Sequence, residues 1–290
     1  MRALVFLLAV ASAIPAAEDD LNFFEWTGVS PIVIAGYSVG SSDALHEFVA
    51  EQVFRGDVVP GATVRVDLRQ ANHARSINAD PQRLKFEEGQ RYLLLLEPGH
   101  STKAQAKGAL WLVRGVRGAR PVPSEGGPAL FDAIRTFVDI QDSRSHELTW
   151  RRFGDMLEES NPVLLETALA QFQKFRRGEP ELIPVLRPLL DHPLGEIRRE
   201  TAVLLGQILE RNRDQELPDE AAVLGDLAGK ARRDERVDVR VAATEALGVV
   251  PGPGTRRVLE EVAADDPDQL VRFAAEKILL DRRRAAAESS

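Results

Sequence analysis

The chain has 290 residues, of which 37 are Lys or Arg and 45 are Asp or Glu, so its formal net charge is −8. It contains no Cys, which excludes disulfides, thiolate zinc sites, iron–sulfur clusters and a cysteine nucleophile. Hydrophobic residues make up 44% and charged residues 28%, a balance typical of a folded chain. Because nucleic-acid binding needs a clustered positive field, the acidic balance argues against a nucleic-acid partner.

The first residues have the pattern of a secretory signal peptide. Arg2 precedes an apolar run at residues 3–11, and small residues follow. The run is about half the ~20 apolar residues that a membrane span requires. We therefore expect a signal peptide over residues 1–17, cleaved after Ala13 or Ala17. The mature chain should be soluble, without a membrane span, and exported to a periplasm or secreted; a buried N-terminal helix or a retained anchor is the alternative.

Residues 18–122 have the texture of a small β-domain. Four apolar or alternating runs have the length of strands: residues 31–35, 63–69, 91–96 and 109–113. Residues 42–54 fit either a strand or a helical face, and the turn signal at 55–57 favours a strand. About five short strands in ~100 residues predict a small barrel or sandwich.

The order of these strands resembles the OB-like barrel of the netrin and metalloproteinase-inhibitor superfamily. The matching pieces are Ile32-Val33-Ile34-Ala35-Gly36, Glu47-Phe48, Phe54-Arg55-Gly56-Asp57, Val64-Arg65-Val66 and Gly89-Gln90-Arg91-Tyr92-Leu93. The resemblance covers about residues 30 to 120 and implies the barrel shape. Those inhibitors chelate zinc through an N-terminal Cys that this chain lacks. A protease inhibitor acting through the barrel is therefore only a second alternative function.

A Pro- and Gly-rich stretch at residues 121–128 separates this domain from the rest of the chain, because Pro and Gly there stop strands and helices alike. We expect a linker and connecting helices over residues 123–160. The remainder, residues 161–290, is rich in Ala, Leu, Glu and Arg at helical spacing.

This last part reads as repeated helix pairs. Three helical segments align on Arg198, Arg240 and Arg272, and each follows an acidic turn. A first repeat, which matches the other three less closely, begins at Asn161. Partner helices are expected before and between them, at residues 181–190, 219–230 and 254–263. Helix pairs repeating at about 30 to 45 residues form an α-solenoid.

The repeat pattern resembles the HEAT-like repeats of phycobilisome lyases over about residues 160–285. Lyase activity is not implied, because many unrelated proteins share this scaffold. The predicted fold class is thus an α+β multidomain chain, in which a small OB-like β-barrel precedes an all-α HEAT-like solenoid.

The acidic turns and the aligned Arg residues have a structural interpretation. Asp191, Asp234 and Asp266 can cap the helices that follow them. Each aligned Arg can reach an Asp of the adjacent repeat, which would give a ladder along the solenoid. The expected pairs are Asp191/Arg198, Asp234/Arg240 and Asp266/Arg272. Ligand binding by these residues is the alternative.

One motif carries possible chemistry. Gly36-Tyr37-Ser38-Val39-Gly40 matches the G-x-S-x-G nucleophile elbow of α/β-hydrolases. Too few residues precede it to build the oxyanion-loop strand of that fold, so we expect a turn of the barrel here. A serine hydrolase that uses Ser38 is the first alternative function.

No metal motif accompanies it. No two of the five His residues are spaced as i, i+4, so none forms a helical zinc motif, and each is expected on the surface or in a loop: His46, His73, His100, His146 and His192. We expect no catalytic, metal-binding or cofactor-binding residue.

Arg doublets recur along the predicted solenoid and end in Arg282-Arg283-Arg284. A basic ridge is one interpretation. Acids are interleaved with the doublets, as at Glu200 and Glu235, so a salt-bridged solvated face is the preferred one.

These observations predict a non-enzymatic, cofactor-free, exported scaffold. Its repeat surface would bind an unidentified protein partner by shape and charge complementarity. The reasons are a clear repeat and the lack of an assembled catalytic constellation in the sequence.

Overall fold

A computed structural model of the chain describes residues 22–42, 45–68, 86–99, 108–113, 118–123 and 127–288. The chain divides into two compact units, Met1–Ser145 and His146–Ser290. The division lies inside the segment 123–160, where connecting helices are predicted. The predicted signal peptide lies outside the described residues.

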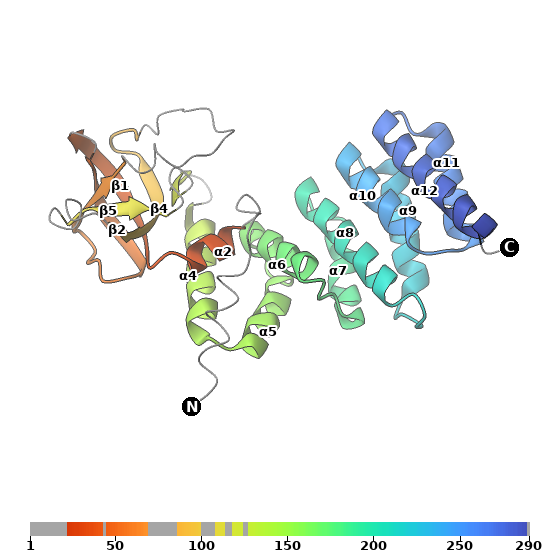
Figure 1. Ribbon diagram of the computed structural model, residues 1–290, viewed down its shortest axis with the longest axis horizontal. Helices are drawn as coiled ribbons and strands as arrows, with labels where there is room; N and C mark the ends of the chain where they lie inside the picture. The colour runs from red at the N-terminus through yellow and green to blue at the C-terminus, as the bar shows by residue number, and fades with distance from the viewer. Residues whose placement is uncertain are drawn as a thin grey trace. The chain divides into compact units, whose positions relative to one another are not determined.

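The described part of the first unit contains a six-stranded sheet: β1 (Ile32–Ser42), β2 (Leu45–Arg55), β3 (Thr63–Asp67), β4 (Arg91–Pro98), β5 (Leu110–Leu112) and β6 (Ala119–Pro121). The strands follow the order β1-β2-β3-β5-β4, and β1 also pairs with β4, so five strands close into a barrel (Figure 1). The short β3–β5 pairing is parallel, and β6 extends the sheet beside β4. The predicted barrel is confirmed, and so is the strand expected at residues 42–54.

The barrel core follows from the alternation of the strands. In β3, Thr63 and Arg65 are exposed while Val64 and Val66 are buried. The alternating residues therefore place a Val pair against Ile34 of β1 and other apolar side chains in the interior. In contrast, β4 is buried continuously from Tyr92 to Leu96, as expected of a strand that is apolar on both faces.

Two helices complete the described part of the first unit, α2 (Phe23–Gly28) and α4 (Gly127–Ser143). The helix α2 was not expected from the sequence. It begins at a capping box, in which Asn22 and Glu25 each accept the other's backbone amide at 3.1 Å. Phe24 then packs edge-to-face on Phe137 of α4, with ring centroids 5.6 Å apart.

One side chain ties these two helices to the barrel. Arg55, the last residue of β2, donates to the Thr27 carbonyl oxygen at 2.7 Å. Its other terminal nitrogen donates to Gln141 and pairs with Asp142 in α4, both at 3.0 Å. Strand β2, α2 and α4 are therefore joined at one guanidinium.

The second unit is helical. Its described elements are α5 (His146–Met156), α6 (Pro162–Lys174), η2 (Pro180–Leu182), α7 (Ile183–Leu189), α8 (Gly195–Arg211), α9 (Glu220–Arg233), α10 (Val237–Gly248), α11 (Pro253–Asp265) and α12 (Gln269–Glu288). The predicted helices and their predicted partners are all present. Among the described residues, no helix has the length and apolarity needed to cross a membrane.

The helices of this unit pack in two rows. The row that carries the aligned Arg residues consists of α8, α10 and α12, which contact one another in chain order (Figure 1). The partner row consists of α7, α9 and α11, and each of these also contacts the next. Each helix pair therefore buries its apolar side on the neighbouring pair.

Two glycines at matching positions allow this close packing. Gly206 of α8 and Gly248 of α10 each lie eight residues after an aligned Arg. A Cβ atom on Gly206 would lie 3.0 Å from the Cα atom of Ala246 in α10, and one on Gly248 would lie 2.8 Å from Ile278 in α12. The absence of a side chain at these positions allows the close approach of α8 to α10 and of α10 to α12.

We predict that Gly206→Leu lowers the free energy of unfolding of the helical unit by about 1–3 kcal/mol, because the new side chain meets the backbone of α10. Urea unfolding followed by circular dichroism would measure it. Gly225→Leu in α9 is the matched control, since no atom lies within 4 Å of its Cβ position. Equal effects of the two substitutions would contradict this packing.

Candidate functional site

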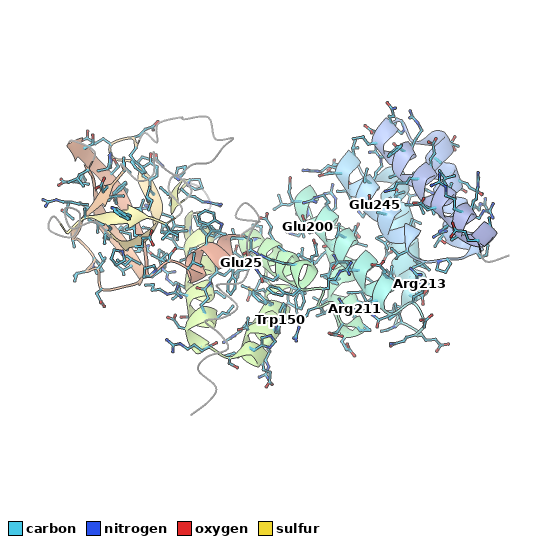
Figure 2. All side chains as sticks on the ribbon, viewed as in Figure 1. Glu25, Trp150, Glu200, Arg211, Arg213 and Glu245 are labelled. Atoms are coloured by element: carbon cyan, nitrogen blue, oxygen red, sulfur yellow. The ribbon has the colours of Figure 1, made fainter. Side chains whose placement is uncertain are left out.

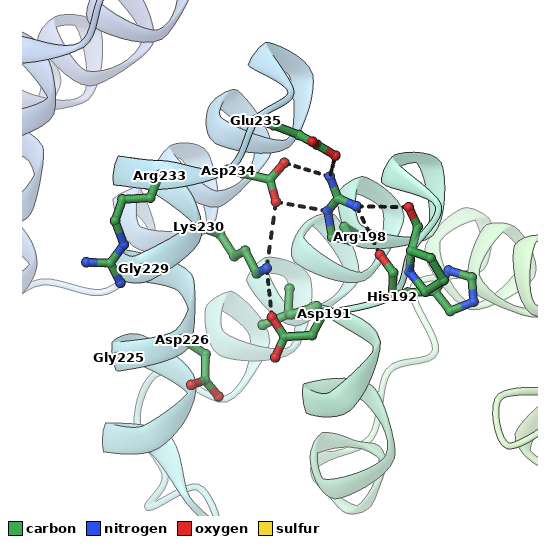
Figure 3. A pocket seen from close by; sticks show the side chains of 12 residues that line it. Asp191, His192, Arg198, Gly225, Asp226, Gly229, Lys230, Arg233, Asp234 and Glu235 are labelled. Carbon is green, nitrogen blue, oxygen red and sulfur yellow. Dashed lines mark hydrogen bonds and ion pairs between the residues drawn. The ribbon is translucent and has the colours of Figure 1, made fainter.

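A guanidinium joins consecutive helix pairs of the second unit. Nε and Nη2 of Arg198 donate to the two carboxylate oxygens of Asp234, both at 2.9 Å (Figure 3). Its Nη1 donates to the carbonyl oxygens of His192 and Pro193 at 3.0 and 3.2 Å. Arg198 thus binds the backbone of its own loop and the carboxylate of the next loop.

The same arrangement recurs one helix pair later. Arg240 binds both carboxylate oxygens of Asp266 at 2.9 and 3.1 Å and the carbonyl oxygen of Asp234 at 2.9 Å. We call the two pairs, Arg198–Asp234 and Arg240–Asp266, the Arg–Asp ladder. The predicted contact of each of these two Arg residues with the adjacent repeat is confirmed.

The structure corrects two details of that prediction. Asp234 and Asp266 do not cap the following helices; they end α9 and α11, and each accepts a backbone amide two residues later, at 3.1 and 2.8 Å. Asp191 does not pair with Arg198; it pairs with Lys230 of α9 at 2.8 Å. The carboxylates therefore shape turns rather than helix starts, because a carboxylate that binds the amide two residues on closes a local turn.

The ladder is buried, so each of its charges depends on its partner. The Arg198 and Asp234 side chains are 7% and 3% exposed. Burial pushes the pKa of the Asp234 carboxyl up, but hydrogen bonds from Arg198 and the Arg236 amide outweigh it and hold the pKa below its ordinary value. Hydrogen bonding to Asp234 raises the pKa of Arg198 against the opposing effect of burial. Both groups are therefore charged at neutral pH.

A pocket of about 620 Å³ lies beside the first ladder pair (Figure 3). Lys230 lies in it between Asp191 and Asp234, at 2.8 and 3.7 Å. Asp226, which also lines it, pairs with Arg187 at 2.9 Å. These charges are paired with one another in joining the helix pairs, whereas Arg233, which also lines the pocket, has no ion-pair partner among the described residues.

A second groove, of about 720 Å³, runs over α8, α10 and α12. Two large apolar side chains of α12 line it while remaining open to solvent: Leu270 is 66% and Phe273 63% exposed. Polar and charged residues surround them, and Val203 and Val241 continue the apolar floor. We call this surface the α12 groove.

The rim of the α12 groove carries both signs of charge. Glu245 of α10 (Figure 2) and Lys277 of α12 are exposed, and neither has a hydrogen-bond or ion-pair partner within the described part of the chain. In contrast, Arg236 pairs with Glu196 at 2.6 Å and with Asp238 at 2.8 Å. The free charges thus flank the apolar end of the groove.

Sequence reasoning missed the α12 groove, although the aligned repeats contained its signal. The residue just after each aligned Arg is Arg199 in α8, Val241 in α10 and Phe273 in α12. A large aromatic residue at a position that is charged in an earlier repeat indicates an exposed apolar anchor.

The G-x-S-x-G motif lies inside β1, which pairs with β2 from Val33 to Ser42 and with β4 from Ile32 to Tyr37. The predicted turn is therefore wrong; the chain remains a strand, with a register irregularity between Ser38 and Gly40. A hydrolase elbow needs a sharp turn from strand to helix that exposes the serine, whereas Ser38 is 1% exposed.

Ser38 does have an imidazole partner. Its Oγ lies 2.8 Å from Nε2 of His46 in β2, which is 5% exposed, so the expected surface position of this His is wrong. His46 packs against the rings of Phe48 and Phe86 at 4.9 and 4.6 Å. Asp67 pairs with Leu45 across β2 and β3, so its side chain projects from the opposite face of this ladder to that of His46.

The remaining histidines do not assemble a site. His146 is exposed on α5, and His192 is half-buried between α7 and α8. His73 and His100 lie outside the described residues. Within the residues whose positions are described, no group of three or more His, Asp or Glu side chains could hold a metal ion.

Several Arg doublets are engaged by neighbouring acids, as the sequence indicated. The pairs include Arg151–Glu147, Arg152–Asp155, Arg199–Glu200, Arg232–Glu261 and Arg257–Glu261. These doublets therefore form a mixed-charge surface.

Comparison of the chain with protein-family models, curated proteins and solved structures finds no match. The geometry of the described residues is therefore what supports a function.

We predict that Arg240→Met lowers the free energy of unfolding of the helical unit by about 3–5 kcal/mol, because Asp266 keeps a buried charge without its partner. Arg272→Met at the end of the same series should cost less than about 1 kcal/mol, since it has no such carboxylate among the described residues. Urea unfolding at neutral pH measures both. Similar losses for the two variants would contradict the ladder.

We predict that acid weakens the barrel through His46. Burial lowers the pKa of its imidazole below the ordinary 6.5, so below about pH 6.5 the unfolded chain binds a proton that the folded barrel does not. The free energy of unfolding of the barrel should therefore be unaffected by His46 above that pH and decrease as the pH falls below it. His46→Gln should make this decrease smaller.

Urea unfolding at pH 7.5 and 5.5 would measure this pH dependence. A Trp150→Phe background restricts tryptophan fluorescence to Trp26 and Trp111 in the first unit. An unchanged pH dependence in His46→Gln would show that the imidazole is not held neutral by the fold.

Proposed function

We propose that the protein is an exported, non-enzymatic scaffold whose helical unit is a HEAT-like α-solenoid, preceded by an OB-like barrel. The α12 groove binds a segment of a protein partner. The observation that carries this function is the pair of exposed apolar side chains of α12, Leu270 and Phe273, in the groove that α8, α10 and α12 form.

The composition of the groove supports binding of a protein segment. Interfaces gain most of their affinity from a few buried aromatic or aliphatic anchors, surrounded by polar groups that exclude water. Phe273 and Leu270 provide such anchors, and the unpartnered charges of Glu245 and Lys277 provide the polar surroundings. A partner that covers them removes apolar surface from water and finds both signs of charge at the edge.

The Arg–Asp ladder supports the same function by fixing the groove. Arg198 links α8 to the loop that precedes α10, and Arg240 links α10 to the loop that precedes α12. A surface held in one shape before binding loses less conformational entropy when a partner docks.

A serine hydrolase that uses Ser38 remains the alternative, and the Ser38–His46 hydrogen bond is the observation in its favour. The burial of Ser38 within a paired strand and the opposite projection of Asp67 weigh against it. We expect a fluorophosphonate probe to leave the protein unlabelled. Labelling that disappears in Ser38→Ala would replace the scaffold with the hydrolase.

We predict that a photo-crosslinking amino acid in place of Phe273 forms a discrete adduct with a partner in the exported fraction of the source cells. The groove is expected to bring the partner within reach of that side chain. The same amino acid in place of Arg257, an exposed residue of α11 outside the groove, is the matched control. Adducts at both positions, or at neither, would contradict docking in the α12 groove.

A further inference from the structure

Arg272, the last of the aligned arginines, has the anchored pose of the other two. Its Nη1 donates to the carbonyl oxygens of Asp266 and Pro267 at 2.6 and 3.1 Å. Arg198 makes the matching pair of contacts with His192 and Pro193. The backbone of the preceding loop therefore holds the Arg272 guanidinium in the same way as that of Arg198.

The other edge of this guanidinium differs from its two counterparts. In Arg198 and Arg240, Nε and Nη2 grip a carboxylate of the next loop. Within the described residues, Nε and Nη2 of Arg272 have no carboxylate, because α12 is the last helix of the series. In the described part of the chain, Nε and Nη2 of Arg272 are thus left open, whereas the same two nitrogens of Arg198 and Arg240 each bind an Asp carboxylate.

A further helix pair could not approach α12 as closely as α8, α10 and α12 approach one another. The position that is Gly206 in α8 and Gly248 in α10 is Leu280 in α12, and Leu280 is 46% exposed. A Cβ atom alone already crowds the next helix at both glycines. A loop or an extended segment can reach Arg272 without that close packing.

We propose that the free edge of the Arg272 guanidinium, which lies on α12 outside the residues that line the groove, binds a side-chain carboxylate of the partner segment where that segment leaves Leu270 and Phe273. This inference rests on the proposed docking function and specifies the chemistry of the partner. The evidence is the filling of the equivalent site by Asp234 and Asp266 within this molecule.

The chemistry selects an acidic residue in a turn. A guanidinium offers two parallel N–H groups that match the two oxygens of a carboxylate. Asp234 and Asp266 meet this fork while binding a backbone amide two residues later, so the local geometry is that of an Asp-led turn. The partner segment is therefore expected to carry Asp in a turn, with an apolar residue a few positions away.

Random twelve-residue peptides displayed on phage and selected on the full chain would test this. We expect the recovered peptides to share an Asp or Glu near an apolar residue. Arg272→Gln should weaken their binding about tenfold or more, and Arg284→Gln, a matched exposed Arg of α12, should not. Replacing the peptide's Asp by Asn should weaken binding to the parent chain but add nothing in Arg272→Gln.

The outcomes separate this inference from the proposed function. Peptides that lose binding in Phe273→Ser but bind Arg272→Gln normally would overturn the carboxylate site and leave the groove in place. Peptides unaffected by both substitutions, or no selected peptides, would overturn both. Self-association in sedimentation that Arg272→Gln abolishes would assign the site to a second copy and overturn the partner.

Discussion

The second unit depends on the placement of a few guanidinium groups between consecutive loops. Nη1 of Arg198 donates to the carbonyl oxygens of the loop before its own helix, and Nε and Nη2 donate to Asp234 of the next loop. This fixes two loops to one another with charge-assisted bonds in a nearly dry environment. A buried carboxylate without its partner lowers the stability of the fold. A packing in which the repeats slip past one another would separate these pairs and is therefore disfavoured.

The end of the helical series is closed by a different contact. Arg282 of α12 donates to the carbonyl oxygens of Leu247, Gly248 and Val250, which lie at and just after the end of α10. Burial and the nearby positive charge of Arg213 lower the pKa of Arg282, so both disfavour the charged form of its guanidinium. The last helix is therefore held from both of its ends: the loop contacts of Arg272 near its start and the carbonyl cluster near its finish.

The sequence predicted the elements well because their periodicity is strong. The strand at residues 42–54 and the helices around Arg198, Arg240 and Arg272 lie where the patterns put them. Ser38 was misplaced because a motif match carries no information on whether the flanking chain pairs on both sides. Helix α2 was missed because it is short and depends on a capping box and on Phe137, which is distant in the chain. The exposure of Phe273 could not be predicted without knowing which side of α12 faces away from α10 and α11.

The location of the exposed apolar pair at the last helix has a physical reason. Two residues before the aligned Arg, α8 carries Glu196 and α10 carries Asp238, and Arg236 joins these two acids across the helices. Hydrogen bonds from Arg236 lower the pKa of Asp238, so this position serves internal pairing in both repeats. In α12 the same position is Leu270, an apolar residue whose side chain is 66% exposed. Because Leu270 takes no part in such a pairing, this position of α12 is open to another molecule.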